Sequence, residues 1–180
     1  LAYKVEANEN NPVIEASKMD KFDEVKDTED TLEVTGKDGN NAFEVILDKT
    51  TGYITSYKYA GETLMVEGPV PNYYRAMIEN DTYLGTDTSD LKYTADKFKV
   101  RDITVEKLEK MVKVTVEGYI PTATETPNTI TYTIFPNGQI VVNNTATIHS
   151  TKALTRVGMK ISIPEEFENF TYYGRGPWEN

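Results

Sequence analysis

The chain has 180 residues, with 19 Lys and Arg, 29 Asp and Glu and a single His, which gives a formal charge of −10 at pH 7. This acidic balance argues against a nucleic-acid-binding protein and against attraction to an anionic membrane surface, because both need clustered basic side chains. No apolar run approaches the roughly 20 residues of a membrane span, and the lack of cysteine excludes disulfides, thiol nucleophiles and zinc–thiolate sites.

The composition predicts β structure in one domain of ordinary size. The chain has 15 Val, 12 Ile and 24 Thr against 10 Ala and 8 Leu, and β-branched side chains favour pleated surfaces over helices. Residues 1–27 differ, because Asn8–Pro12 is a linker signal and dense charge follows. We interpret residues 1–27 as the tail of a preceding element and a connecting arm, with a short helix near 14–22 as the alternative, and residues 28–180 as a β-sandwich.

Short alternating segments then follow one another, most of them bounded by Gly, Asn or Asp turn signals. In the third of them Tyr53, Thr55, Tyr57 and Tyr59 are expected to share one face, whereas residues 68–94 lack a period of two and are typical of a functional loop. No helix of ten or more residues is predicted, so the fold class is all-β, an antiparallel β-sandwich. The predicted strands are 31–35, 42–47, 53–59, 63–66, 99–105, 110–117, 129–135, 139–149 and 155–163.

Few residues offer catalytic chemistry on their own. A serine triad would depend on His149 and on a Gly-x-Ser-x-Gly turn, which is absent, so His149 is expected to be a solvated residue at a strand end. A glycosidase needs two carboxyls, but in a chain with 29 acids such pairs arise by chance, and a catalytic pair within this chain is not favoured. The candidate pairs are Glu79 with Asp81, Glu165 with Glu166 in an expected surface turn, and Glu179.

Two kinds of ligand site stay open. Asp81, Asp87 and Asp90 offer hard oxygens for calcium, but the EF-hand spacing is missing, and solvated loop acids are favoured. Aromatic side chains could stack on sugar rings or be buried in the sandwich core. The candidates are Tyr73, Tyr74, Tyr172, Tyr173 and Trp178. We favour burial in the core for the tyrosines and give sugar stacking and burial equal weight for the tryptophan.

Two segments resemble a known family. Residues 71–81 (PNYYRAMIEND) resemble the Asn-Phe-Trp-Arg-Ala-Pro-x-Asp-Asn-Asp segment of the large bacterial β-galactosidases of glycoside hydrolase family 2, and residues 172–180 (YYGRGPWEN) resemble their Gly-Arg-Gly-Pro-x-Glu-Asn-Tyr segment. Residues 48–54 and 131–138 are similar to further turns of the family in the same order. Residues 1–3 resemble the end of the immunoglobulin-like domain that precedes this region, so the resemblance implies that residues 1–27 are the end of that domain and a linker. Departures from the pattern include Met77 where Pro is usual, whereas Tyr74 in place of Trp keeps the aromatic and Glu79 in place of Asp keeps the acid.

The resemblance implies the C-terminal small-chain region of a β-galactosidase, a sandwich similar to the galactose-mutarotase fold of which this chain is a truncated part. The catalytic glutamates would lie upstream on a (β/α)₈ barrel, so the fragment alone is expected to be inactive and to wall and support the sugar pocket. The whole enzyme would hydrolyse terminal β-D-galactosides with retention. Candidate pocket or loop-fixing residues, including an Arg75–carboxylate fork, are Tyr74, Arg75, Glu79, Asn80, Asp81, Arg175, Trp178 and Glu179.

The resemblance also implies partners and cofactors. The expected partners are the rest of the parent chain with its barrel, a β-galactoside, and a second copy through unpaired strand edges, but neither nucleic acid nor membrane. No cofactor is expected in this fragment, and any Mg²⁺ or Na⁺ would belong to the parent enzyme, in the bacterial cytoplasm or periplasm. Two alternatives stay open: a free-standing carbohydrate-binding sandwich without hydrolysis, and a mutarotase or epimerase, which would need an acid and a base near the sugar and has only His149.

Overall fold

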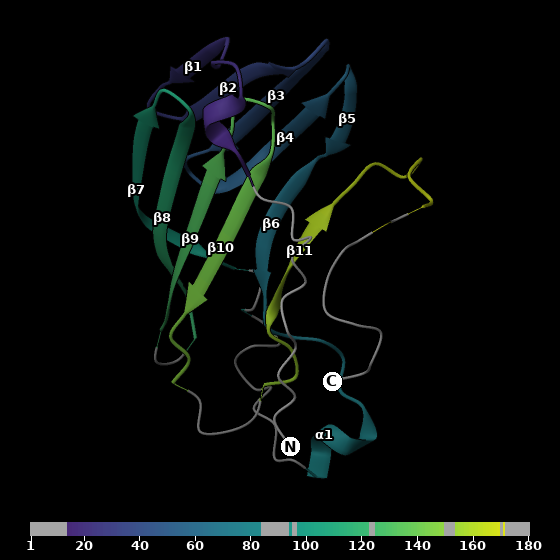
Figure 1. The fold of residues 1–180 in the computed structure, drawn as a ribbon. Coiled ribbons are helices and arrows are strands. Elements are labelled where there is room, and N and C mark those ends of the chain that lie inside the picture. The colour runs from purple at the N-terminus through teal and green to yellow at the C-terminus, as the bar shows by residue number, and fades with distance from the viewer. Residues whose placement is uncertain are drawn as a thin grey trace.

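Two antiparallel sheets face one another in the computed structural model, which describes residues 14–83, 94, 97–122, 125–149, 154–169 and 171 (Figure 1). The larger sheet has the strand order β1-β2-β3-β4-β6-β11, with β5 paired to β4, and the smaller has the order β10-β9-β8-β7. The predicted antiparallel β-sandwich is confirmed. The strands of the larger sheet are β1 (Glu24–Asp27), β2 (Thr31–Asp38), β3 (Asn41–Asp48), β4 (Tyr53–Tyr59), β5 (Glu62–Met65), β6 (Glu67–Asn72) and β11 (Gly158–Ser162).

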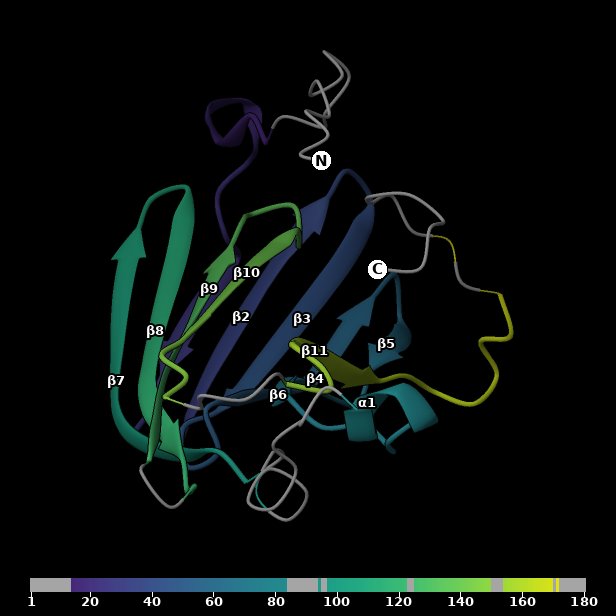
Figure 2. The ribbon, with the colours of Figure 1, turned by 90° about the horizontal axis from the view of Figure 1, so that it is seen from below.

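The smaller sheet is a meander of four strands joined by consecutive connections. It contains β7 (Lys99–Leu108), β8 (Met111–Ile120), β9 (Thr126–Ile134) and β10 (Ile140–Ala146). The helical elements whose bounds fall within the described residues are a 3₁₀ turn at Ala16–Lys18 and α1 (Glu79–Tyr83). β7 lies at one side of the molecule, and β11, β5 and α1 lie at the other (Figure 2). No helix in the described part of the chain is long and apolar enough to cross a membrane.

The structure differs from the predicted elements in two places. β1 lies within the segment interpreted as a connecting arm, yet it pairs with β2 along its whole length, as in Val25 with Val34. β6 lies partly in the segment predicted as a loop, although it contains Pro69 and Pro71. Proline lacks an N–H and is rare in strands, which is why the sequence pattern predicts no strand there.

A β-bulge in β4 also overturns the predicted face of that strand. Ile46 pairs with Ser56 and Leu47 pairs with Ile54, so Thr55 has no partner on β3. A bulge shifts the alternation of inward and outward side chains. Ile54 is therefore fully buried and Thr55 is exposed, and Thr55 does not share a face with the tyrosines.

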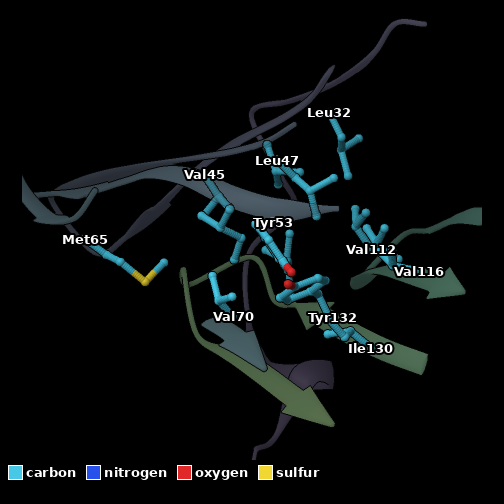
Figure 3. Packing of buried hydrophobic residues seen from close by; sticks show 14 of the residues in the cluster. Leu32, Val45, Leu47, Tyr53, Met65, Val70, Val112, Val116, Ile130 and Tyr132 are labelled. Atoms are coloured by element: carbon cyan, nitrogen blue, oxygen red, sulfur yellow. The ribbon is translucent and has the colours of Figure 1, made fainter. Parts of the chain in front are cut away.

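The core fills the space between the two sheets (Figure 3). Alternate residues of facing strands are fully buried, such as Val34 on β2 and Val114 on β8, and each buried Val, Leu or Ile side chain contributes about 1.5–3 kcal/mol. Tyr132 crosses between the sheets, since its hydroxyl donates to the backbone oxygens of Gly52 at 3.1 Å and of Pro69 at 3.4 Å. The two sheets are thus joined by apolar packing with a polar contact at its centre.

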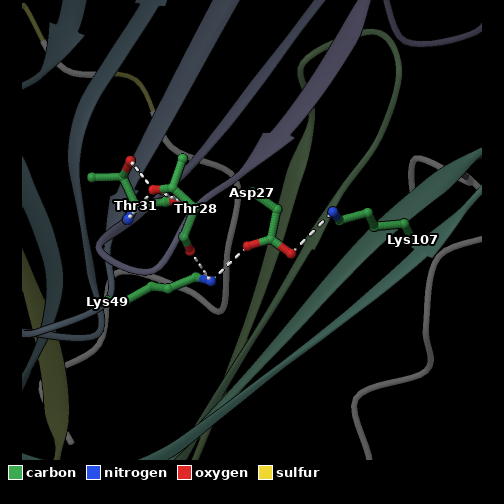
Figure 4. Close-up of polar contacts among 5 residues, drawn as sticks. All are labelled: Asp27, Thr28, Thr31, Lys49 and Lys107. Carbon is green, nitrogen blue, oxygen red and sulfur yellow. Dashed lines mark hydrogen bonds and ion pairs between the residues drawn. The ribbon is translucent and has the colours of Figure 1, made fainter.

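An ion cluster joins the sheets at the side where β1 and β7 lie (Figure 4). Asp27 on β1 accepts a hydrogen bond from Lys49 Nζ at 2.5 Å, and its other oxygen lies 3.0 Å from Lys107 Nζ on β7. Lys49 also donates to the backbone oxygen of Thr28 at 2.6 Å. One carboxylate therefore connects both sheets at this side.

Candidate functional site

The chain leaves the larger sheet after β6 and turns into α1, and this segment carries most of the described candidate residues. We call residues 72–81 the Arg75 corner. Its backbone is anchored at two points, because the N–H of Tyr74 donates to Oδ1 of Asn72 at 3.3 Å and the N–H of Arg75 donates to Oγ1 of Thr155 at 3.4 Å. Thr155 lies shortly before β11, the strand that pairs with β6, so the corner is fixed to the segment that leads into the neighbouring strand.

A bidentate ion pair closes the Arg75 corner. Arg75 Nη1 donates to Asp81 Oδ2 at 2.6 Å and Arg75 Nη2 donates to Asp81 Oδ1 at 3.1 Å. Such a fork fixes both the distance and the plane of the two groups. The backbone N–H of Ile78 donates to the same carboxylate at 2.8 Å. The expected Arg75–carboxylate fork is therefore present, and its acid is Asp81.

The fork determines the charge of Asp81. The hydrogen bond from Arg75, followed by that from the N–H of Ile78, holds the pKa of the Asp81 carboxyl below its usual range. Asp81 is therefore a carboxylate at neutral pH and cannot donate a proton. A glycosidase acid needs the opposite, a raised pKa, so Asp81 is not suited to be the general acid of such a pair.

The side chains around the fork differ in exposure. The Arg75 side chain is 34% exposed and that of Asp81 is 8% exposed, so the cation faces solvent while its partner lies beneath it. Glu79 and Asn80 begin α1 and are exposed, and Tyr74 is half-buried. The same segment of the chain thus carries a fixed, partly exposed cation and two exposed polar side chains.

The remaining predicted residues fall elsewhere. His149 is exposed beyond the end of β10, as expected, and Glu165 and Glu166 are exposed in the predicted turn. Within the described residues, no three His, Asp or Glu side chains are grouped to hold a metal ion. The other candidates lie outside the described residues: Asp87, Asp90, Tyr172, Tyr173, Arg175, Trp178 and Glu179.

Tyr73 takes the buried alternative, at 1% exposure, and its hydroxyl accepts hydrogen bonds from two asparagines, Asn128 and Asn144. Neither asparagine is among the candidate residues predicted from the sequence. A signal was available, because Asn128 continues the inward alternation of Ile130 and Tyr132 along β9. A polar residue in phase with a buried row needs a hydrogen-bonding partner, and here that partner is Tyr73.

An apolar cavity of about 430 Å³ lies between the sheets on the side of β10 and β11. Its lining includes Ile54, Met65, Val142 and Ile161 and contains no Asp or Glu among the described residues. Sugar pockets need polar groups that bind hydroxyls, and hydrolysis needs carboxyls. This cavity therefore offers the side-chain amides of Gln139 and Asn169 but, among the described residues, no carboxyl for hydrolysis.

Comparison with known proteins gives consistent matches. A family model described as the β-galactosidase small chain matches residues 39–180. The chain is 29% identical over 159 residues to a β-galactosidase of Priestia megaterium, covering 87% of this chain and 15% of that protein. It is 29% identical over 148 residues to a β-galactosidase of Lactobacillus delbrueckii subsp. bulgaricus, covering 81% and 15%, and 29% identical over 150 residues to one of Clostridium acetobutylicum, covering 82% and 16%. The chain thus spans about 15% of the length of the relatives that it matches.

Proposed function

The chain belongs to the β-galactosidase small-chain family, as its motifs predicted, and we propose that it is a non-catalytic region of a β-galactosidase whose Arg75 corner walls and supports the sugar pocket. The proposed partner is the rest of a longer chain, with a (β/α)₈ barrel that carries the two catalytic glutamates. The whole enzyme would hydrolyse terminal β-D-galactosides with retention, through a covalent glycosyl intermediate.

The observation that carries the proposal is the fork between Arg75 and Asp81. It fixes a partly exposed guanidinium in one orientation, with Asp81 kept ionised beneath it. A cation held in this way can donate hydrogen bonds to sugar hydroxyls without first being ordered, which reduces the entropy lost on binding. Glu79 and Asn80, which directly precede Asp81 in the chain, are exposed and supply acceptors and donors of the kind that orient a sugar.

The chemistry of the carboxyls indicates which part of the enzyme binds the sugar and which part reacts with it. Retaining hydrolysis needs one carboxyl as acid and base and another as nucleophile, roughly 5–5.5 Å apart. Asp81 is occupied by Arg75 and Ile78 and has a lowered pKa. The corner is therefore suited to binding and positioning, and the reacting carboxyls are proposed to come from the barrel.

Arg75→Ala in the complete enzyme tests the proposal, with kcat and KM measured on an aryl β-galactoside and Tm measured in parallel. We expect kcat/KM to fall about tenfold or more, because a misplaced binding group is costly at a sugar site. The matched control is Arg101→Ala. Arg101 also pairs with a carboxylate, Glu125 at 2.5 Å, but lies over the ring of Tyr119 on the smaller sheet.

The control variant is expected to keep the kinetics of the parent enzyme. Unchanged kinetics together with an unchanged Tm in Arg75→Ala would remove both the wall and the support role. A lower Tm with unchanged kinetics in Arg75→Ala would support the structural role of the Arg75 corner and contradict its role as a wall of the sugar pocket. If the gene encodes no barrel and the chain alone binds galactosides, the free-standing carbohydrate-binding module replaces the proposal.

A further inference from the structure

One buried side chain of the Arg75 corner is hydrogen-bonded to the opposite sheet. Tyr73 directly follows β6 and is 1% exposed. Its hydroxyl accepts a hydrogen bond from Nδ2 of Asn128 on β9 at 2.8 Å and another from Nδ2 of Asn144 on β10 at 2.7 Å. Tyr73 thus ties the end of β6, in the larger sheet, to two strands of the smaller sheet.

The two asparagines occupy inward positions of those strands. Asn128 pairs with Ala146 and Asn144 pairs with Ile130, so the asparagines are diagonal neighbours on one face of the sheet. Farther along β9 the same face carries Ile130 and Tyr132, which are both fully buried. The polar cluster begins where the apolar core ends and where the Arg75 corner departs.

Stability alone does not account for this cluster. Among the described residues, no hydrogen-bond donor meets Oδ1 of Asn128 or Oδ1 of Asn144, and both atoms are buried. A buried acceptor without a partner costs about 1–3 kcal/mol, and apolar side chains of similar shape avoid that cost. A buried polar cluster of this kind is better explained by the single arrangement that it imposes on the parts it joins.

We propose that Tyr73, held by Asn128 and Asn144, is a positioning residue that sets the Arg75 corner against the smaller sheet and so sets where the corner meets the sugar. This inference rests on the proposed function, because it requires the corner to lie at the pocket. Tyr73 acts through Arg75, since its own ring is buried. The motif that residues 71–81 resemble has Phe at this position, so the hydroxyl anchor is a feature of this chain and not of the motif.

The connection from Tyr73 to Arg75 is short. A single residue, Tyr74, separates them, and Tyr74 packs against the cluster of Tyr73 and Ile120. Any displacement of Tyr73 therefore passes to the backbone of Arg75, which is held otherwise by the long hydrogen bond to Thr155 at 3.4 Å. A displacement of about 1 Å at a positioning group can cost up to about 100-fold in rate.

The test is Tyr73→Phe in the complete β-galactosidase, with kcat and KM measured on an aryl β-galactoside. The variant keeps the ring packed against Ile120 and removes only the acceptor that the two amides share. We expect KM to rise about three- to tenfold with kcat little changed. Asn144→Ala removes one of the two donors without touching the corner, and it is expected to raise KM in the same direction.

The matched control is Tyr132→Phe. It removes a hydroxyl from a fully buried tyrosine, but the lost hydrogen bonds go to Gly52 and Pro69 within the main core. We expect Tyr132→Phe to lower Tm and to leave KM within about twofold of the parent enzyme, since it lies outside the corner.

The outcomes separate the two proposals. If Tyr73→Phe and Asn144→Ala leave KM unchanged while Arg75→Ala alters the kinetics, the positioning role is overturned and the proposed function stands. If Arg75→Ala also leaves the kinetics unchanged, the proposed function is contradicted. The positioning role is then contradicted as well, because it rests on that function. An equal rise in KM for Tyr73→Phe and Tyr132→Phe would indicate general destabilisation and would overturn the positioning role as well.

Discussion

The guanidinium of Arg75 binds both carboxylate oxygens of Asp81, six positions along the chain, at 2.6 and 3.1 Å. The ion pair fixes the orientation of the Arg75 side chain at the point where the chain leaves the larger sheet. Because the carboxylate is buried and the cation is partly exposed, the arrangement holds the guanidinium from below and leaves part of it open to a ligand.

Arg75→Lys is expected to recover only part of what Arg75→Ala loses. A lysine keeps the positive charge but offers a single flexible ammonium in place of the planar fork. In the complete enzyme we expect kcat/KM for an aryl β-galactoside to lie between the values of the parent and of Arg75→Ala. A lysine variant with full activity would show that charge alone is sufficient and that the fork geometry is irrelevant.

Asp27→Asn is expected to destabilise the fold in a pH-dependent way. The hydrogen bond from Lys49, and then that from Lys107, hold the pKa of the Asp27 carboxyl below its usual range, against the opposing effect of burial. A carboxyl with a lowered folded-state pKa stabilises the fold above its unfolded value, about 3.9, and loses that contribution as the pH falls through the folded value. The variant should therefore lose about 1 kcal/mol at neutral pH and nothing in strong acid.

Denaturant unfolding of the parent and of Asp27→Asn at several pH values measures this difference. The control is Asp23→Asn, because Asp23 lies 3.8 Å from Lys37 and both side chains are more than half exposed. Exposed pairs of this kind contribute little, so the control should match the parent at every pH. A difference for Asp27→Asn that does not shrink in acid would contradict the assigned role.

Gly118→Ala is expected to lose more than about 3 kcal/mol of folding free energy, because overpacking against backbone cannot relax. A Cβ at Gly118 would lie 2.2 Å from the backbone oxygen of Lys99 and 2.5 Å from Cζ of Phe98. Gly158 is also in a strand but has open space around the added atom, so Gly158→Ala should change stability by less than about 0.5 kcal/mol. Equal unfolding midpoints for the two variants would show that β8 does not approach Phe98 and Lys99 as closely as described.

The strands that sequence alone predicted best are those with one face on the opposite sheet. In β8, Val112, Val114 and Val116 are fully buried and alternate with residues that are only partly buried, so the sequence carries a clean period of two. The bulge at Thr55 and the proline-containing β6 were not predictable in the same way. One inserted residue reverses which side chains of a strand face the core. A strand tolerates a proline only where no neighbouring strand needs an N–H at that position.

The candidate site shows the same division. The motif around Arg75 led us to expect a fork with a carboxylate, and the structure identifies Asp81 as that acid. The contacts of Tyr73 with Asn128 and of Asp27 with Lys107 join residues far apart in the sequence. Such contacts depend on how the two sheets stack, and a single sequence does not encode that stacking as a local pattern.

The most direct measurement of the central claim is the rate of aryl β-galactoside hydrolysis by the isolated 180-residue chain, shown to be folded by a cooperative thermal transition, beside the rate of the complete enzyme. We expect no turnover by the isolated chain and full activity in the longer protein, because the reacting glutamates are proposed to lie on the barrel. Saturable hydrolysis by the isolated chain would contradict the account, since it would place a catalytic carboxyl pair within these 180 residues.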